Sequence, residues 1–536
     1  MFCRMEFDFL IIGAGSAGCV VANRLSADAS SSVGLLEAGG PDNYPWIHIP
    51  VGYFKTMGNP KTDWCYKTEP DPGLNNRSLD WPRGKTLGGS SSINGLLYVR
   101  GQPQDFNHWR QLGNSGWSWE DVLPLFKRSE SWEGQDDGIR GQEGPLTVSR
   151  NRVNRGIVDA WLAAAVAAGH KWTDDYNQED QEGVGYFQMT MKGGRRCSSA
   201  VAYLNPVKHR KNLTVLTRAH TQRIIIKDGK AVGAEVRING DVKIIRARKE
   251  IILCTGAIGS PQLLMLSGIG DGNELQDHGI ETRYNLPGVG KNLQDHLQVR
   301  PIYKCDASTI NTEKQNPLKL LGMAFQYAAM RSGPMAMAAS LGTGFLKTHP
   351  DLETPDIQYH IQPFSADKIA DGAHKFSAFT ASVCQLRPES RGSISLKSSN
   401  SEDYPVIRPN YLSTKTDCDT IVAGLKITRS ICQHEPVSSL ITEEYEPGDA
   451  VEKNNYDSLL NWAREHGTTI YHPVGTCKMG NDAMAVVDDK LRVHGVSNLR
   501  VADASIMPTI TSGNTNAPSI MIGEKLSDMV LATYKK

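Results

Sequence analysis

Three glycines and one glutamate near the start of the chain have the spacing of a dinucleotide-binding site. Gly13, Gly15 and Gly18 follow the apolar residues 9–12 in the order G-x-G-x-x-G. Glycine at the first two positions lets the backbone turn sharply and approach a pyrophosphate, and the following helix start offers free N–H groups. Glu37 ends a second apolar run, where its carboxylate can accept both hydrogen bonds of an adenosine ribose. The segment therefore predicts a bound dinucleotide without a 2′-phosphate.

A strand, a helix and a second strand must position these four residues. The apolar residues 9–12 predict the first strand, and residues 33–36 predict the second. The segment between them is amphipathic, as expected for a helix that packs on a sheet. A lone glycine triplet is weak evidence and can be a simple turn, but its combination with this order of elements favours a Rossmann-like unit.

The strand and glycine pattern returns late in the chain. Residues 251–253 form an apolar run that leads into Gly256 and a helical segment. Residues 499–502 form another apolar run that ends in Asp503, much as the second strand ends in glutamate. This order predicts a chain that leaves a nucleotide-binding domain, builds another domain and comes back to complete the first.

Length and composition limit the class of protein. The chain has 536 residues, which favours two large units over one core. Lysine plus arginine equal aspartate plus glutamate at 58 each, so the net charge indicates neither a nucleic acid nor an acidic polymer as partner. No apolar run approaches ~18 residues, and residues 1–8 are too short and polar for a signal peptide. The expected location is the cytoplasm, with peripheral contact with the inner membrane as an open alternative.

The cysteines indicate neither a disulfide framework nor a metal site. Ten are scattered along the chain without a C-x-x-C pair, and the histidines do not cluster. This distribution is typical of free thiols in a reducing compartment. No bound metal is predicted.

Several separated motifs together resemble one enzyme family. Residues 84–107 (GKTLGGSSSINGLLYVRGQPQDFN) and residues 256–270 (GAIGSPQLLMLSGIG) match its two signatures, and HPVGT at 472–476 and GNTNAP at 513–518 match its C-terminal part. With the N-terminal glycine motif, they make the chain similar to the glucose-methanol-choline (GMC) family of FAD-dependent oxidoreductases. The similarity spans essentially the whole chain and is greatest to the bacterial alcohol and choline dehydrogenase branch.

The resemblance implies that the dinucleotide is FAD and that it is not covalently bound. Some family members link the flavin to a histidine at the position of Ile93, and isoleucine cannot form that bond. The N-terminal motif would hold the ADP half, residues 88–95 would lie along the pyrophosphate, ribityl chain and isoalloxazine, and residues 503–504 would lie near the ribityl chain. The expected FAD contacts are Gly13, Gly15, Ser16, Ala17, Gly18, Glu37, Ala38, Arg83, Thr86, Gly88, Gly89, Ser90, Ser91, Asn94, Gly95, Gly256, Asp503, Ala504, Asn514 and Asn516.

The resemblance also implies two catalytic residues. Oxidation of a primary alcohol to an aldehyde requires a base for the hydroxyl proton while a hydride leaves carbon for flavin N5. His472 in the HPVGT motif is the predicted base, because imidazole titrates where such catalysis operates. Asn514 matches the family's histidine or asparagine partner, whose amide can orient the substrate oxygen. The same GNTN segment can equally be a turn that caps the last helix, for which Asn516 looks better suited.

Acceptor and substrate remain open from the sequence. The resemblance implies that Ile470 lies near the flavin face, where it leaves less room for oxygen than a smaller residue. This favours a dehydrogenase that passes electrons to a quinone or other carrier. An oxidase that uses O2 and makes hydrogen peroxide is the alternative, and an FAD-containing lyase similar to hydroxynitrile lyases is another. Phe345, Tyr359 and Phe364, with methionines such as Met330, suggest an apolar pocket. We therefore expect an aliphatic or aromatic primary alcohol as the small-molecule substrate, in preference to choline.

The predicted fold class is α/β, or α+β overall, with a Rossmann-like FAD-binding domain and an interleaved substrate domain on an antiparallel sheet. Residues 1–155, 201–298 and 471–536 are expected to form the FAD-binding domain, with a lid-like excursion at 38–80 and the catalytic residues in the last part. Residues 156–200 and 299–470 are expected to form the substrate domain.

Overall fold

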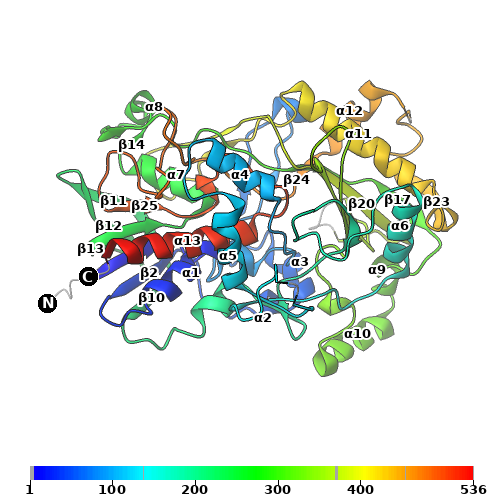
Figure 1. Cartoon of the computed structure of the whole chain (residues 1–536), viewed down its shortest axis with the longest axis horizontal. Coiled ribbons are helices and arrows are strands. Elements are labelled where there is room, and N and C mark those ends of the chain that lie inside the picture. Colours follow the sequence, from blue (N-terminus) through cyan, green and yellow to red (C-terminus); the bar gives the residue numbers. More distant parts are fainter. Residues whose placement is uncertain (1–4, 137, 368–371, 453, 535–536) are drawn as a thin grey trace.

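Two large sheets, side by side along the long axis of the molecule, organise the fold (Figure 1). The computed structural model describes residues 5–136, 138–367, 372–452 and 454–534. Within these ranges one sheet has seven strands and the other has eight. Helices cover both sheets, and the mixed α/β class predicted from the sequence is confirmed.

The seven-stranded sheet is the dinucleotide-binding type. The strand order is β10-β2-β1-β13-β12-β11, with β25 beside β13, and β10, β2, β1, β13 and β25 run parallel. Its parallel strands β1 and β2 are buried almost throughout, so they appear in the sequence as nearly continuous apolar runs. The strands are β1 (Glu6–Ile12), β2 (Val33–Glu37), β10 (Leu213–Thr217), β11 (Ala219–Lys227), β12 (Lys230–Ile238), β13 (Asp241–Leu253) and β25 (Leu499–Val501).

Two helices from opposite ends of the chain cross closely beside this sheet (Figure 1). Helix α1 (Ser16–Leu25) follows the glycine turn, and α13 (Asn516–Tyr534) is the last helix. A Cβ atom on Gly523 would lie 2.9 Å from the Ala17 carbonyl oxygen, so the helices approach nearly to backbone contact. The C-terminal segment is thereby held against the start of the chain.

The eight-stranded sheet is antiparallel, and helices cover one of its faces. Its order is β23-β17-β20-β19-β18-β7, with β16 beside β20 and β24. Tyr359 of β19 donates a hydrogen bond to the Gly424 carbonyl on α11 (Lys415–Cys432) and its ring lies against Trp161 on α6 (Gly156–Ala167). The strands are β7 (Gly183–Tyr186), β16 (Leu297–Val299), β17 (Ile302–Cys305), β18 (Gly342–Leu346), β19 (Ile357–Gln362), β20 (Ala378–Gln385), β23 (Ile441–Glu446) and β24 (Thr468–Thr469).

Shorter elements connect the two sheets and cover their edges. The remaining helices are α2 (Pro45–His48), α3 (Tyr53–Thr56), α4 (Pro103–Gln111), α5 (Trp119–Ser129), α7 (Gly256–Leu266), α8 (Gly272–Asp277), α9 (Ile310–Glu313), α10 (Pro317–Met330) and α12 (Tyr456–His466). The remaining strands are β3 (Tyr66–Lys67), β4 (Asp80–Trp81), β5 (Glu130–Trp132), β6 (Leu146–Val148), β8 (Met191–Lys192), β9 (Arg195–Arg196), β14 (Ile269–Gly270), β15 (Tyr284–Asn285), β21 (Ser393–Ser395) and β22 (Val406–Arg408).

Helix α10 packs differently from the other long helices. It protrudes from the molecule (Figure 1), and Leu318, Leu321 and Phe325 are 80%, 68% and 73% exposed. Tyr327 is its only residue classed as buried. Most large apolar side chains of this helix are therefore exposed.

Replacement of Gly18 by alanine is expected to destabilise the fold at the first turn. The added Cβ would lie 1.9 Å from the Gly13 carbonyl oxygen and 3.2 Å from Cys254 Cβ, so backbone must move. Overpacking of this kind costs roughly 1–3 kcal/mol, which a lowered thermal unfolding midpoint would report. Gly40→Ala is the matched control, because nothing lies within 4 Å of its added Cβ. Equal midpoints for the two variants would contradict the prediction.

Candidate active site

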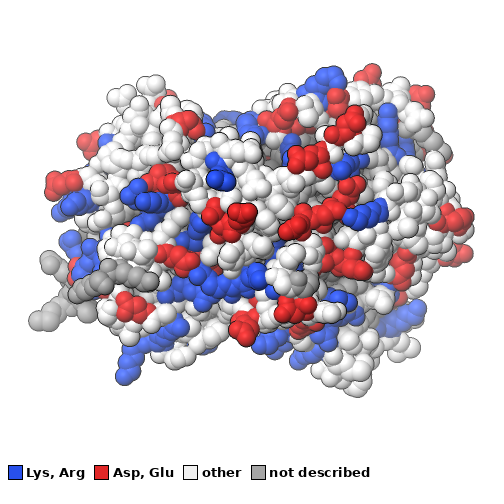
Figure 2. Space-filling model, viewed as in Figure 1, with Lys and Arg blue, Asp and Glu red and all other residues white. Residues whose placement is uncertain are grey.

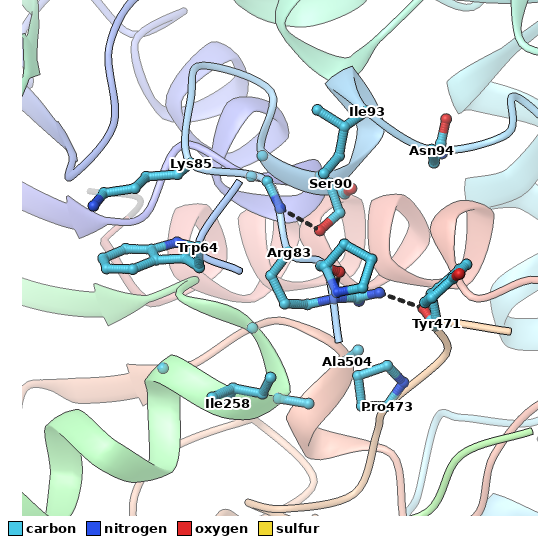
Figure 3. Close-up of a pocket in the computed structure, with 18 of the residues that line it drawn as sticks. Trp64, Arg83, Lys85, Ser90, Ile93, Asn94, Ile258, Tyr471, Pro473 and Ala504 are labelled. Carbon is cyan, nitrogen blue, oxygen red and sulfur yellow. Dashed lines mark hydrogen bonds between the residues drawn. The ribbon is translucent and has the colours of Figure 1, made fainter. Parts of the chain in front are cut away.

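A cavity of about 610 Å³ lies between the two sheets. It extends from the carboxyl ends of β1 and β2 to the face of β19 that the helices leave uncovered, and its walls come from chain segments far apart in the sequence. Figure 3 shows part of this wall, where the loops around Arg83 and Ser90 face Ile258, Tyr471 and Pro473. An elongated cavity of this kind suits a long ligand that reaches from one sheet to the other.

At one end the cavity has the groups expected for an adenosine. The buried Glu37 carboxylate accepts hydrogen bonds from the N–H groups of Ala14 (3.0 Å) and Gly39 (2.8 Å). Burial raises the pKa of Glu37 to about 7, so a hydroxyl donor at this carboxylate would stabilise its charged form. The turn before α1 needs glycine, since Gly13 has φ +99° and a Cβ there would lie 2.4 Å from the Cys254 carbonyl oxygen.

Aromatic side chains that sequence reasoning missed line the same end. Trp64, Tyr66, His220 and Tyr404 contact one another and line the cavity, and Lys85 Nζ lies 4.3 Å from the Trp64 ring (Figure 3). Their positions lie in loops and at strand ends with no motif of their own, so the sequence carried no signal for them.

In the middle of the cavity two glycine turns meet. A Cβ on Gly89 would lie 2.7 Å from Gly15 Cα, so the two loops are in backbone contact. Gly256 has φ +80° and no atom within 4 Å of its missing Cβ, and it lines the cavity. Asp503 accepts hydrogen bonds from the Gly256 N–H (2.9 Å) and the Ser260 hydroxyl (2.6 Å), which joins the second and the last segment that the chain contributes to this sheet. These features leave room for a ligand close to backbone N–H groups, as a pyrophosphate requires.

Most residues expected to contact the cofactor line this cavity, and four lie behind its wall. Gly18 packs against Gly13, and Thr86 Oγ1 donates to the Gly40 carbonyl at 3.1 Å. Ser91 Oγ donates to the Gly88 carbonyl at 2.6 Å. The lining residues among the predicted ones are Gly13, Gly15, Ser16, Ala17, Glu37, Ala38, Arg83, Gly89, Ser90, Asn94, Gly95, Gly256, His472, Asp503, Ala504, Asn514 and Asn516.

The two residues predicted to be catalytic are in direct contact at the other end. Asn514 Nδ2 lies 3.0 Å from His472 Nε2, although the residues are in different motifs. Asn516 is the first residue of α13, and its Oδ1 accepts a hydrogen bond from the Ser16 hydroxyl at 2.8 Å. Asn514 thus faces the histidine, whereas Asn516 joins α13 to α1.

A chain of hydrogen bonds determines which nitrogen of His472 carries the proton. His296 Nε2 lies 3.0 Å from the Leu386 carbonyl, which can only accept, so Nε2 of a neutral His296 is protonated and Nδ1 is not. His472 Nδ1 lies 3.0 Å from His296 Nδ1 and must therefore donate to it. His472 Nε2 is left unprotonated beside the Asn514 amide, which donates to it. Gln358 Nε2 in turn lies 3.4 Å from Asn514 Oδ1, consistent with this orientation of the amide.

Burial keeps the histidines at this end neutral. It lowers the pKa of His296 to about 4 and that of His360 to about 3. Burial also lowers the pKa of His472 well below its usual value, and nearby His296, His360 and Arg83 lower it further. At neutral pH His472 Nε2 is therefore unprotonated and is a hydrogen-bond acceptor.

His296, His360 and Asp295 belong to the site but were not predicted from the sequence. Asp295 accepts a hydrogen bond from the His472 backbone N–H at 2.7 Å, and His360 lines the cavity. Residues 286–297 have a composition typical of a domain boundary. The neighbouring Asp295 and His296 were the only feature of this segment that indicated a functional site. His360 lies inside a strand. Alternation assigns its side chain to one face of the sheet but does not show which part of the protein lies against that face.

The wall near His472 is more polar than the sequence predicts. Gln358, His360 and Gln362 alternate along β19 on the face away from the helices, and His360 and Gln362 line the cavity. Phe364 lines it as well, whereas Tyr359 lies on the helix-covered face and Met330 is 62% exposed. Within the described ranges no group of three or more His, Cys, Asp or Glu side chains is arranged to hold a metal, and the nine described cysteines are free. Cys3 lies outside the described residues.

The parallel sheet, the glycine turns and a histidine at the far end of the cavity define a dinucleotide-dependent oxidoreductase. Comparison with known proteins assigns the family: the GMC oxidoreductase description matches residues 7–298 with its N-terminal part and residues 388–523 with its C-terminal part. The chain belongs to this family, as its resemblance predicted.

Similar proteins match over almost their whole length. An alcohol dehydrogenase [acceptor] from Pseudomonas putida is 42% identical over 534 residues, which cover 98% of this chain and 96% of that protein. An oxygen-dependent choline dehydrogenase from Brucella ovis is 43% identical over 529 residues, with the same coverage. Among solved structures, pyridoxine 4-oxidase from Mesorbium loti has 30% identity and a TM-score of 0.89, and covers 99% of this chain and 100% of its own. Formate oxidase from Aspergillus oryzae has 27% identity and a TM-score of 0.92, and covers 99% of each chain.

The neutral histidines are expected to make stability fall in acid. An unfolded histidine takes up a proton near pH 6.5, whereas folded His296 resists protonation until about pH 4, so the unfolded state binds more protons in this window. His296 therefore removes on the order of 3 kcal/mol of folding free energy as the pH falls from 6.5 to about 4.

Chemical unfolding of the protein and of His296→Gln across this range would measure the effect. The glutamine variant should lose less stability on acidification, while His209→Gln, at an exposed position, should follow the wild type. An acid dependence in His296→Gln equal to that of the wild type would refute the assignment.

Proposed function

We propose that the protein oxidises a primary alcohol to the aldehyde with FAD as cofactor and His472 as base. The observation that carries the proposal is the unprotonated His472 Nε2 held beside the Asn514 amide at the end of the cavity. The names of similar proteins support it: alcohol dehydrogenase, choline dehydrogenase and pyridoxine 4-oxidase all denote oxidations at a hydroxyl carbon. A lyase activity is disfavoured, because these relatives are dehydrogenases and oxidases.

FAD fits the cavity, and we propose that it binds without a covalent link. Work on the formate oxidase structure concerns its FAD, which supports the same cofactor here. Glu37 would hold the adenosine, the turns at Gly15 and Gly89 the pyrophosphate, and the loop with Ser90 and Asn94 the ring end. Ile93 lines the cavity and has no nucleophilic atom with which to attach to the flavin. Bound FAD supplies the two-electron acceptor for the reaction.

The residues of the chain then handle the proton and the substrate oxygen. The substrate hydroxyl would donate to His472 Nε2, and the Asn514 amide, already beside that nitrogen, would hold the oxygen. Because Nδ1 already donates to His296, proton uptake at Nε2 makes an imidazolium. The buried Asp295 carboxylate accepts a hydrogen bond from the His472 backbone N–H and so holds the turn that presents the ring.

For the electron acceptor we propose a quinone or another carrier. Ile470 lines the cavity two positions before His472, and its branched side chain occupies space that oxygen would need. Use of O2 with formation of hydrogen peroxide is the second candidate, supported by the oxidases among the similar structures.

We propose the domain division expected from the sequence, and the strand order supports it. β7, β18, β19 and β20 come from residues 156–200 and 299–470 and share the eight-stranded sheet. In this division, the substrate domain supplies the polar wall and the FAD-binding domain supplies His472.

We further propose that α10 makes peripheral contact with a membrane, from which a quinone can be reached. Between residues 314 and 331 the cations are Lys314, Lys319 and Arg331, and no acidic residue occurs. An exposed apolar helix flanked by cations suits an anionic lipid surface. In Figure 2 charges of both signs are interspersed over the visible face, and the corner that α10 occupies in Figure 1 is largely white. No helix in the described ranges is long and apolar enough to cross a membrane.

Replacement of His472 by glutamine is expected to slow flavin reduction by about 10² to 10⁴-fold, because the base is lost while the side chain keeps a similar size. The visible flavin spectrum would be followed as a primary alcohol is added without oxygen, and then as oxygen or a quinone-like dye is admitted. Recovery with dye only would identify a dehydrogenase, and fast recovery in air an oxidase. His349→Gln, at an exposed position, is the control. Near-normal bleaching of the variant with full FAD content would rule His472 out as the base.

The double substitution Leu321→Glu and Phe325→Glu is expected to weaken binding to vesicles that contain anionic lipid by at least about tenfold, because two apolar side chains no longer enter the interface. Sedimentation with vesicles measures the bound fraction. Leu112→Glu, at a residue 46% exposed elsewhere, is the control. Failure of the wild type to bind, or a shift in oligomeric state of the variant without a change in vesicle binding, would count against the membrane proposal.

A further inference from the structure

Arg300 is a cation without a counter-ion in the wall of the cavity. It directly follows β16, is partly exposed, and lines the same cavity as His472. Among the described residues no carboxylate forms an ion pair with it, and no hydrogen bond of its guanidinium is present. By contrast, the fully buried Arg100 and Arg140 both pair with Glu130.

Other polar groups that line the same cavity also lack hydrogen-bond partners. The Tyr53 hydroxyl is buried, lines the cavity and has no hydrogen-bond partner. Tyr53 and Tyr471 both lie close enough to Arg300 to affect its pKa. The Oε1 atom of Gln362 and both ring nitrogens of His360 are buried without partners as well. Buried polar groups are nearly always hydrogen-bonded, so a cluster of unpartnered ones that lines a cavity indicates a polar ligand.

Acidic residues do not balance this charge from within the cavity. The acidic residues that line it belong to other parts: Glu37 to the adenosine end, Asp503 to the middle, and Glu402 and Asp403 to a loop beside Gln262. Glu446 and Asp367 influence Arg300 from outside the cavity wall, and Asp367 is paired with His374 at 3.0 Å.

An unpaired guanidinium in such a place is costly unless an anion arrives. Partial removal of a charge from water without a partner is unfavourable, and a bidentate carboxylate or a similar anion would compensate for the lost hydration. Burial also lowers the pKa of Arg300, as expected for a cation that lacks a counter-ion here.

We propose that Arg300 and Tyr53 form an anion-binding subsite for the substrate, so that the alcohol oxidised at His472 is a hydroxy acid with a carboxylate or sulfonate at its far end. The assignment rests on the proposed alcohol oxidation. His296, which contacts His472, precedes Arg300 by four positions on an extended segment, about 13 Å from Cα to Cα. The arginine side chain spans part of that distance, which leaves room for a short chain between anion and hydroxyl.

The subsite would also select against choline. A quaternary ammonium ion needs a carboxylate or an aromatic cage, and Arg300 would repel it. Gln298, on the same strand wall, is a neutral amide whose Nε2 donates to the Thr469 carbonyl at 3.3 Å. The anion preference therefore has an attractive component toward acids and a repulsive one toward cations.

Anaerobic flavin reduction with matched substrates tests the subsite. The probes are straight-chain ω-hydroxycarboxylates of three to six carbons, the corresponding sulfonates, the 1-alkanols of equal length, and choline. The wild type should prefer the acids in kcat/KM. Arg300→Gln should lose about 10- to 100-fold toward the acids, chiefly in KM, and change little toward alkanols. Arg300→Lys should recover part of the loss, Tyr53→Phe should lose less, and Arg152→Gln, at an exposed position, should match the wild type.

A binding measurement separates failure of the subsite from failure of the proposed function. Butanoate and propanesulfonate carry the anion without a hydroxyl, and calorimetric titration of the holoenzyme should show binding that Arg300→Gln abolishes. If no alcohol or hydroxy acid reduces the flavin, the alcohol oxidation is wrong whatever the anions do. If alkanols equal or exceed the acids, if choline is preferred, or if Arg300→Gln binds the anions as the wild type does, the subsite is refuted. Preference between carboxylate and sulfonate identifies which anion the substrate carries.

Discussion

The geometry around His472 depends on the hydrogen bonds that the buried carboxylate of Asp295 accepts. It accepts hydrogen bonds from the Tyr411 hydroxyl, the Thr469 hydroxyl and the His472 backbone N–H, and thus connects three separate segments. Burial raises its pKa to about 6, and these three donors oppose that rise by stabilising the charge. Without such a partner the turn that presents His472 would leave an unsatisfied backbone donor in the protein interior.

The direction of the hydrogen bonds around His472 comes from one carbonyl group. Because the Leu386 carbonyl can only accept, His296 must donate from Nε2, and His472 must donate from Nδ1. Each ring can donate only once while neutral, so the lone pair of His472 is left facing Asn514. Burial keeps both rings neutral, so each hydrogen bond in this series keeps the same donor and acceptor at neutral pH. A second neutral histidine here orients the first, in place of the carboxylate that often performs this role beside a catalytic imidazole.

The two sheets contribute different properties to the cavity. The parallel sheet and its glycine turns offer backbone N–H groups and close approach, which any member of the family needs to hold the same cofactor. The antiparallel sheet offers side chains at alternating positions, and β19 directs polar ones toward the cavity while Tyr359 packs under the helices. Substitutions on that polar face would change the side chains that line the cavity without disturbing the helix-covered core. Arg300, directly after β16, lines the same cavity, and a fold can serve different chemistry through such lining residues while its core stays the same.

Local pattern alone determined the first turn of this protein and the cofactor half of its site. Gly13, Gly15 and Glu37 lie within one strand-helix-strand unit, where short-range sterics and hydrogen bonding dictate residue type, so the sequence predicts their placement. The HPVGT and GNTNAP motifs likewise identified His472 and Asn514 through resemblance. Only the tertiary structure decided that these two are in contact, that His296 orients His472, and that Arg300 lies in the cavity without a counter-ion. Those facts depend on strands that pair across long stretches of chain, and alternation along a strand says which face a side chain takes but not what that face meets.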